Sequence, residues 1–194
     1  MEYVNITEKD ALIIVDVQND FCPGGALAVP EGDQIVPIIN KYIEKFVSKN
    51  AIVVATRDWH PKNHVSFKEY GGIWPVHCVQ NTWGAEFHQM LRLPKNVIII
   101  SKAFESEVEA YSGFQRTELD KILKEKGVKH LFVSGLATDY CVKATVLDAL
   151  KLGYEVYVLV DAIKGVNVRP TDSEDAINEM IKAGAKLLTF NQII

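Results

Sequence analysis

The sequence has little cysteine, no long apolar run and no cluster of basic residues. Its three cysteines do not suggest a disulfide framework and indicate a reducing compartment. Apolar runs such as 97–100 and 156–160 are far shorter than the roughly 20 residues needed to cross a bilayer. Residues 1–10 are polar and acidic, without a basic stretch before an apolar one, so no secretory signal is expected. The sequence therefore predicts a cytoplasmic protein.

The composition is that of a soluble globular protein. Of the 194 residues, 48% are hydrophobic and 24% are charged, with a net charge of −4. Without a basic patch, neither nucleic acid nor an anionic membrane is expected as a partner. The length fits one domain, and no repeat or linker divides residues 1–194. A homo-oligomer is left open.

Short apolar runs alternate with helical patterns along the chain, which favours an α/β fold. Several of these runs are rich in Val and Ile throughout, as is typical of parallel strands covered on both faces. Strand–helix alternation predicts a parallel sheet with helices on both faces. The expected strands are Ala11–Val17, Ala51–Thr56, Val97–Ser101, His130–Ser134, Glu155–Val160 and Lys186–Phe190.

Four helices are expected in the segments between these strands, where apolar residues recur at helical spacing. Asp33 and Thr117 precede the first two of these segments and are expected to cap the helices. Before the fourth, Thr171 and Glu174 have the spacing of a capping box.

Polar residues at the strand ends are the candidates for chemistry, because ligands of parallel sheets bind outside the carboxyl ends of the strands. Asp16 closes the first apolar run, and Lys102 follows the third. Taken singly, Asp16 could be a structural carboxylate and Lys102 an exposed lysine. In a parallel sheet, however, both emerge at the same edge.

Cys141 follows the fourth strand, where the next helix is expected to begin. A helix N-terminus lowers the pKa of a thiol, and its N–H groups can stabilise an oxyanion. A buried inert cysteine is the alternative. The order strand, turn, cysteine, helix resembles a nucleophile elbow, so Asp16, Lys102 and Cys141 together suggest covalent catalysis.

A second cluster follows the second strand. Asp58 and His60 alternate, so both can face one side of an extended segment, and His64 and His77 lie downstream. Two imidazoles and one carboxylate suit zinc, manganese or iron(II) in an open site. Exposed loop histidines, or a closed structural zinc site that uses Cys78, are the alternatives.

Taken together, these residues resemble the nicotinamidase family within the isochorismatase-like cysteine hydrolases. The resemblance covers nearly the whole chain, beginning with the Asp16–Phe21 motif DVQNDF. It implies a Rossmann-like three-layer α/β/α sandwich around a six-stranded parallel sheet, and hydrolysis of nicotinamide, and also of pyrazinamide, within NAD salvage. The segments that carry it are 16–25, 56–67, 74–86 and 135–149.

The resemblance also implies roles for individual residues. Cys141 would be the nucleophile, Asp16 the general base and acid, and Lys102 the third member of the triad. The N–H groups of Ala137 and Cys141 would form the oxyanion hole, after a cis peptide bond between Leu136 and Ala137.

By the same resemblance, Asp58, His60 and His77 would bind one divalent ion, with zinc expected first and manganese or iron as alternatives. The ring pocket would be formed by four aromatic residues, namely Phe21, Trp74, Tyr111 and Tyr140. His64 is left open as a fourth ligand, and Cys22 and Cys78 are interpreted as structural.

Two other functions compete with this hypothesis. One is a metal-independent cysteine amidase of the same fold, which would act on a ureido or carbamoyl compound. The other is a non-catalytic binding module in which the metal cluster is structural. Joint possession of a cysteine triad and a metal set favours the nicotinamidase family.

Overall fold

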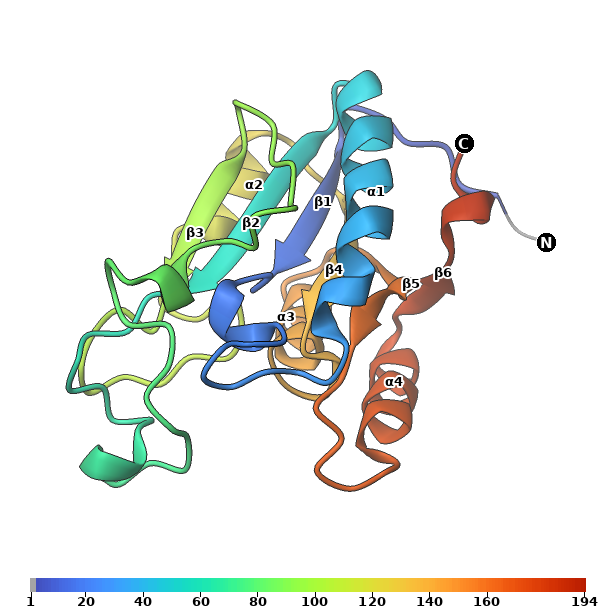
Figure 1. Cartoon of the computed structure of the whole chain (residues 1–194). Coiled ribbons are helices and arrows are strands. Elements are labelled where there is room, and N and C mark those ends of the chain that lie inside the picture. The colour runs from blue at the N-terminus through green and yellow to red at the C-terminus, as the bar shows by residue number, and fades with distance from the viewer. Residues whose placement is uncertain (1–2) are drawn as a thin grey trace.

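Six parallel strands form a single sheet in the computed structural model, which describes residues 3–194 (Figure 1). The strand order is β3-β2-β1-β4-β5-β6, so the predicted parallel sheet is confirmed. Chain order reverses between β1 and β4, which makes this gap the topological switch point of the sheet. The strands are β1 (Asp10–Val15), β2 (Ile52–Asp58), β3 (Ile98–Lys102), β4 (His130–Leu136), β5 (Glu155–Lys164) and β6 (Lys186–Leu188).

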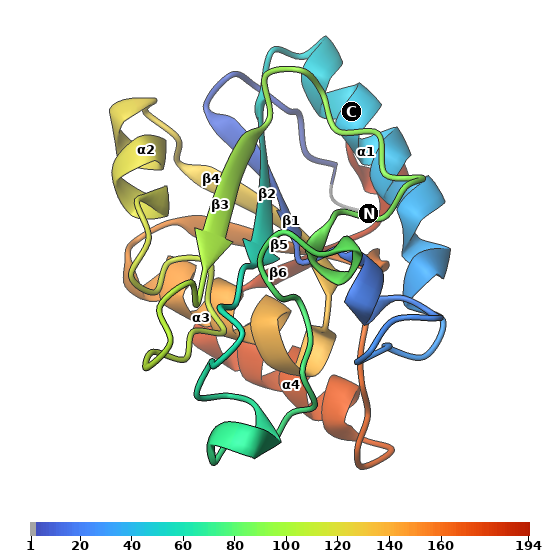
Figure 2. The same cartoon turned by 60° about the vertical axis from the view of Figure 1, so that its left-hand side comes forward.

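Helices cover both faces of the sheet, giving the expected three layers (Figures 1 and 2). Leu12 and Ile14 of β1 face a core shared with α1, whereas Ile13 and Val15 face a core shared with the other three helices. This alternation is the period of two that a strand imposes. Within residues 3–194, no helix has the length and apolar character to cross a membrane. The helices are α1 (Val36–Ser48), α2 (Leu119–Glu125), α3 (Lys143–Lys151) and α4 (Asp172–Ala183).

Local details of the helix starts were predicted wrongly. Asp33 lies in a 3-10 turn and makes no side-chain cap, because α1 begins only at Val36. Thr171 does occupy the N-cap position of α4, but its hydroxyl bonds to Asp175 and no capping box forms. Thr117 accepts the N–H of Leu119 at 3.3 Å, although the N-cap residue of α2 is Glu118.

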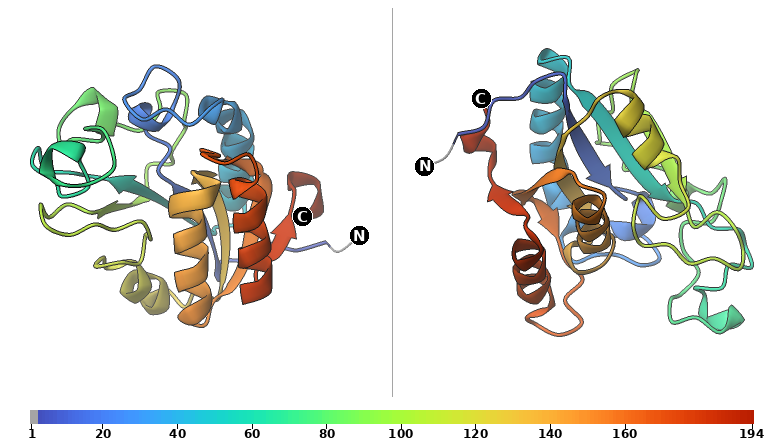
Figure 3. Two further views of the ribbon diagram at one scale, coloured as in Figure 1. Left: turned by 90° about the horizontal axis from the view of Figure 1, so that it is seen from below. Right: turned by 180° about the vertical axis from the view of Figure 1, so that it is seen from behind.

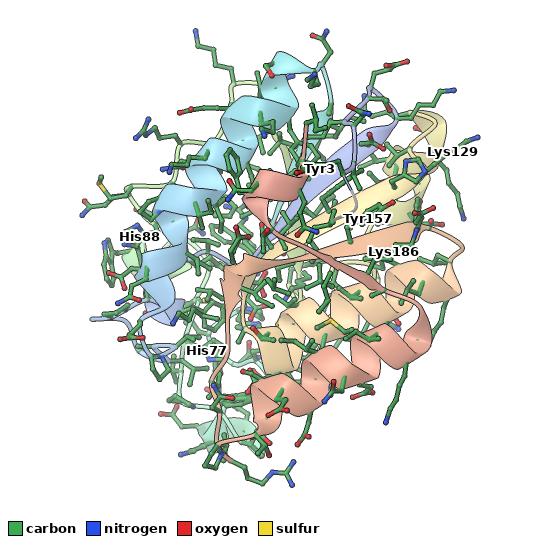
Figure 4. The ribbon with its side chains drawn as sticks, turned by 90° about the vertical axis from the view of Figure 1, so that its right-hand side faces the viewer. Tyr3, His77, His88, Lys129, Tyr157 and Lys186 are labelled. Carbon is green, nitrogen blue, oxygen red and sulfur yellow. The ribbon has the colours of Figure 1, made fainter. Side chains whose placement is uncertain are left out.

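The carboxyl ends of the strands lie at one end of the molecule, where the longest irregular segments gather (Figure 3, left). The turn after β1 bonds there to the loop after β2, through the Asn19 N–H and the Glu86 carbonyl at 2.9 Å. His77 lies at this end, far from Lys129, which precedes β4 (Figure 4). The residues at or just beyond the carboxyl ends of β1, β2, β3 and β4 are thus placed around one site.

Gly135 allows β1 and β4 to approach each other beside the switch point. It pairs with Val15 and adopts a φ of +112°, a conformation that L side chains rarely take. A Cβ at this position would stand 2.1 Å from the Val15 carbonyl oxygen. Glycine is therefore required here for both backbone conformation and space.

We expect Gly135→Ala to lower the free energy of unfolding by about 3 kcal/mol or more, through backbone strain and overpacking. Urea denaturation measures the loss. Gly153→Ala is the matched control, because Gly153 also has a positive φ of +93° but a Cβ added to it would meet nothing within 4 Å. The control should lose only about 1 kcal/mol. Equal losses in the two variants would contradict the steric argument.

Candidate active site and metal centre

Asp16 follows the last residue of β1 and turns the chain out of the sheet. Its φ of +50° is left-handed, so β1 ends at Val15, two residues earlier than expected. The Asp16 carboxylate is buried, and its Oδ1 accepts a hydrogen bond from the Thr56 hydroxyl at 2.8 Å. The turn and this bond together aim the other oxygen, Oδ2, toward the site.

Lys102, the last residue of β3, has no exposed surface and places its ammonium between two carboxylates. Its Nζ lies 2.8 Å from Asp16 Oδ2 and donates a short hydrogen bond to Asp58 Oδ1. Burial alone would lower the pKa of Lys102, but the two carboxylates outweigh it and hold the pKa well above its ordinary value. The ammonium is therefore charged at neutral pH. It is not the exposed lysine that was the alternative interpretation.

Cys141 lies in a turn of π-helix, Thr138–Val142, that leads directly into α3. This turn wraps around the Ala137 carbonyl, which accepts the N–H groups of Tyr140 and Val142 at 3.1 Å each. The peptide bond between Leu136 and Ala137 is cis, as the family resemblance implied. The strand–turn–helix geometry expected around the thiol is thus present.

The thiol and the two carboxylates converge. Asp16, Asp58 and Cys141 each offer an atom within 4.8 Å of the other two, and Cys141 Sγ lies 3.4 Å from Lys102 Nζ. Burial holds the pKa of Cys141 well above its ordinary value, despite the nearby ammonium. The resting nucleophile is therefore a neutral thiol that needs a base.

Asp16 is placed to be that base. Its Oδ2 forms an ion pair with the Lys102 ammonium at 2.8 Å, and a hydrogen bond to the same carboxylate helps to raise the pKa of Cys141, so Asp16 is within reach of the thiol proton. Burial raises the pKa of Asp16, although Lys102 opposes the shift. A carboxylate with a raised pKa is a stronger base and can later return its proton.

Asp58, His60 and His77 form a second buried set, which shares Asp58 with the first and has ligand atoms within 4.8 Å of one another. The His60 Nδ1–H donates to the Ala103 carbonyl at 3.0 Å, and the His77 Nδ1–H donates to the Pro75 carbonyl at 2.7 Å. A carbonyl can only accept, so these bonds direct both Nε2 atoms inward.

The two Nε2 atoms lie 3.4 Å and 3.9 Å from Asp58 Oδ2. Two imidazole nitrogens and a carboxylate therefore face one another, which is an arrangement that a cation stabilises. Lys102 and the histidines lower the pKa of Asp58 against the opposing effect of burial, so it is ionised. The donor set fits a divalent ion such as zinc.

His64 is not part of this set, although its ring stacks on that of His60 with centroids 4.1 Å apart. Its Nε2–H donates to the Val108 carbonyl at 2.9 Å, and its Nδ1 bonds to the Ser66 hydroxyl at 2.6 Å. Both ring nitrogens are occupied, so we interpret His64 as a support for the His60 ring.

The remaining cysteines lie outside the site chemistry. Cys22 is buried in the core on the α1 side, and burial raises its pKa to about 11. Cys78 directs its sulfur toward the Gly84 carbonyl at 3.9 Å and is absent from the ligand clusters among residues 3–194. A structural zinc site that uses Cys78 is thus not supported.

A small pocket opens over Cys141, and its lining combines titratable, aromatic and aliphatic side chains. The Trp74 indole N–H donates to the Tyr111 hydroxyl at 3.0 Å, and the Trp74 and Tyr140 rings meet edge to face at 5.1 Å. All four aromatic residues expected at the ring pocket line it. The aliphatic part of the lining was not predicted from the sequence and comprises Leu27, Val29, Leu136 and Val166.

Gln18 is a second residue that sequence analysis left without a role. Its buried side-chain amide forms two hydrogen bonds of 2.8 Å, donating to the Asp58 carbonyl and accepting the Asp58 N–H. This pairing fixes the end of β2 against the turn after β1. The signal in the sequence was a polar amide two residues beyond Asp16, directly after the last apolar residue of the first strand run.

Comparisons with known proteins agree with this geometry. The isochorismatase domain family matches residues 10–192. The chain is 46% identical to a nicotinamidase of Escherichia coli, over 93% of this chain and 94% of the relative.

Two solved structures are also similar. A pyrazinamidase of Pyrococcus horikoshii in complex with zinc has a TM-score of 0.91 at 59% identity, covering 94% of this chain and 99% of its own. PnC1 from L. infantum in complex with nicotinate has a TM-score of 0.88 at 35% identity, covering 98% and 99%.

Metal content of single variants tests the ligand assignment. We expect His60→Ala and His77→Ala to lose stoichiometric metal, because each removes one inward Nε2, whereas His64→Ala should retain it. All three imidazoles are buried, so the third variant controls for general damage at this site. Elemental mass spectrometry of the dialysed, folded protein gives the number of metal ions bound per chain. Loss of metal from His64→Ala alone would contradict the assignment.

Proposed function

The chain belongs to the isochorismatase family, and we propose that it is an amidohydrolase that converts nicotinamide to nicotinate and ammonia. Pyrazinamide, an aromatic carboxamide of the same shape, is a second substrate. The nicotinamidase relatives and the nicotinate complex of a similar structure support this proposal.

One observation carries the proposal, namely that the cysteine triad and the metal-type set meet in the same pocket. Asp58 belongs to the metal set and receives a hydrogen bond from Lys102, which also contacts Asp16 and Cys141. Asp16, Asp58, His77 and Cys141 all line the cavity. A ring held at the metal set would lie beside the thiol, which suits a pyridine that carries a carboxamide.

In the first half of the reaction, Asp16 Oδ2 takes the proton of the Cys141 thiol while the sulfur attacks the amide carbon. The Ala137 and Cys141 N–H groups stabilise the oxyanion of the tetrahedral intermediate, an effect worth about 3 kcal/mol for each donor. Asp16 then returns the proton to the amide nitrogen, and the C–N bond breaks. Ammonia leaves and a thioester remains on Cys141.

In the second half, a water molecule attacks the thioester through its oxygen, and Asp16 accepts a proton from that water. The C–S bond breaks, Asp16 returns its proton to the sulfur, and the acid that forms releases its own proton to solvent as nicotinate. The Lys102 ammonium keeps the two buried carboxylates compensated throughout, and it stabilises negative charge that develops on sulfur. Aromatic side chains of the pocket exclude bulk water and orient the ring.

Asp58, His60 and His77 would hold the divalent ion, for which we propose zinc because of the two imidazole donors. When bound, such an ion supplies Lewis acidity toward the ring nitrogen of the substrate. The N–H groups directed to Ala103 and Pro75 keep both imidazoles in the tautomer that this role requires.

Replacing the nucleophile and its base tests the covalent mechanism. Cys141→Ala should abolish ammonia release but leave the fold intact, and Asp16→Asn should reduce turnover by at least about 100-fold because an amide cannot accept the thiol proton. Mass spectrometry of quenched wild-type protein should show a nicotinoyl adduct on Cys141. Turnover by Cys141→Ala, measured after checking for contaminating amidase, would contradict the mechanism.

Substrate analogues test the role of the metal set. Benzamide carries the same amide but no ring nitrogen, so it should react far more slowly than nicotinamide, whereas pyrazinamide should still react. A chelator should remove most activity toward nicotinamide, and zinc, manganese or iron(II) added back should restore it. Full activity of metal-free protein would favour a metal-independent amidase instead. Ammonia release measures all three substrates under the same conditions.

A further inference from the structure

The catalytic turn is tied to a loop that takes no part in the proposed reaction, the segment between β5 and α4. The carboxylate of Asp139, two residues before Cys141, accepts the backbone N–H groups of Val166 at 2.9 Å and Asn167 at 2.8 Å. Each oxygen accepts one of these bonds. Hydrogen bonds to an ionised group are stronger than neutral ones, so this contact holds the loop firmly.

The loop is shaped to fit this carboxylate. A Cβ on Gly165 would stand 3.2 Å from Asp139 Oδ1 and 1.8 Å from the Ser173 hydroxyl oxygen, so only glycine permits the approach. Asn167 has a left-handed φ of +53°, and its side chain accepts the Ser173 N–H at 2.9 Å in the first turn of α4. The loop is therefore fixed to the catalytic turn on one side and to α4 on the other.

Val166, whose N–H is held by Asp139, lines the pocket together with Cys141 and packs against the core on the α1 side. Its side chain is half-buried. The Asp139 carboxylate itself does not line the pocket, so any influence on the substrate must pass through the residues that it holds.

We propose that Asp139 is a positioning residue that fixes Val166 as one wall of the ring pocket, a role that rests on the proposed function. Asp139→Asn keeps the size of the side chain but leaves one oxygen, so one loop N–H loses its acceptor and faces an NH₂ group. The loop between β5 and α4 should then move, and Val166 should no longer be held in a fixed position, while Cys141 is unchanged.

The test is a double-mutant cycle on the KM for nicotinamide. We expect Asp139→Asn and Val166→Ala each to raise KM roughly tenfold, the size of one lost hydrogen bond to a charged group, with a much smaller change in kcat. If Asp139 acts through Val166, the double variant should show no further increase. Additive effects, or an unchanged KM in active Asp139→Asn, would overturn the proposal.

Asp161→Asn is the matched control. The Asp161 carboxylate also accepts two bonds, from the Tyr42 hydroxyl at 2.7 Å and the Phe190 N–H at 2.9 Å, but it does not line the pocket. The Asp161→Asn variant should have a Tm lowered to a similar extent as that of Asp139→Asn, and its KM for nicotinamide should be unchanged. A KM increase in this control as large as that in Asp139→Asn would attribute the effect to general destabilisation and overturn the proposal.

Amide hydrogen exchange gives a readout that does not depend on turnover. The Val166 and Asn167 amides should exchange faster in Asp139→Asn than in wild type, and unchanged exchange would overturn the proposal. Wild-type protein that releases no ammonia from nicotinamide would contradict the proposed function, whereas normal exchange in the variant would contradict only the role of Asp139. The two failures are thus distinguishable.

Discussion

Burial of the Lys102 ammonium is the interaction on which the rest of the site depends. Moving an ammonium from water into the protein interior costs several kcal/mol, so a buried ammonium persists only where opposite charges surround it. Asp16 and Asp58 supply these charges, and without the cation the two neighbouring carboxylates could not both remain ionised. The same cation lies 3.4 Å from the Cys141 sulfur. One side chain therefore makes the base, the metal ligand and the nucleophile compatible in a single buried site.

Strand order explains how distant residues reach that cation. Asp16 follows β1 and Cys141 follows β4, so the base and the nucleophile flank the switch point where ligands of open parallel sheets bind. β2 pairs with β1, and β3 pairs with β2. These two strands end in Asp58 and Lys102, which pair in register. Four neighbouring strands thus each contribute one group, and the loops beyond them form the pocket walls.

Much of this arrangement could be predicted from sequence because strand ends are local features. A continuous apolar run that stops at a polar residue, as before Asp16 and Lys102, locates a side chain at the sheet edge without knowledge of the partner strand. Helix starts were harder to predict, although Asp33 and Thr171 are residue types that cap helices. Asp33 lies in a 3-10 turn before α1 begins, and Thr171 bonds to the Asp175 side chain instead of capping α4. The contacts of Gln18 with Asp58 and of Asp139 with Val166 join segments 27 to 40 residues apart. No local pattern predicts such pairings, because they depend on how the loops close over the finished sheet.

The neutral, buried state of Cys141 has a consequence for the lifetime of the protein in an oxidising environment. Peroxides attack thiolates much faster than thiols. Burial raises the pKa of Cys141 and keeps its proton on at rest. The sulfur becomes strongly nucleophilic only when Asp16 removes the proton during turnover. Irreversible oxidation of Cys141 to sulfinic or sulfonic acid is therefore slowed, whereas Cys22 and Cys78 are protected by burial outside the pocket.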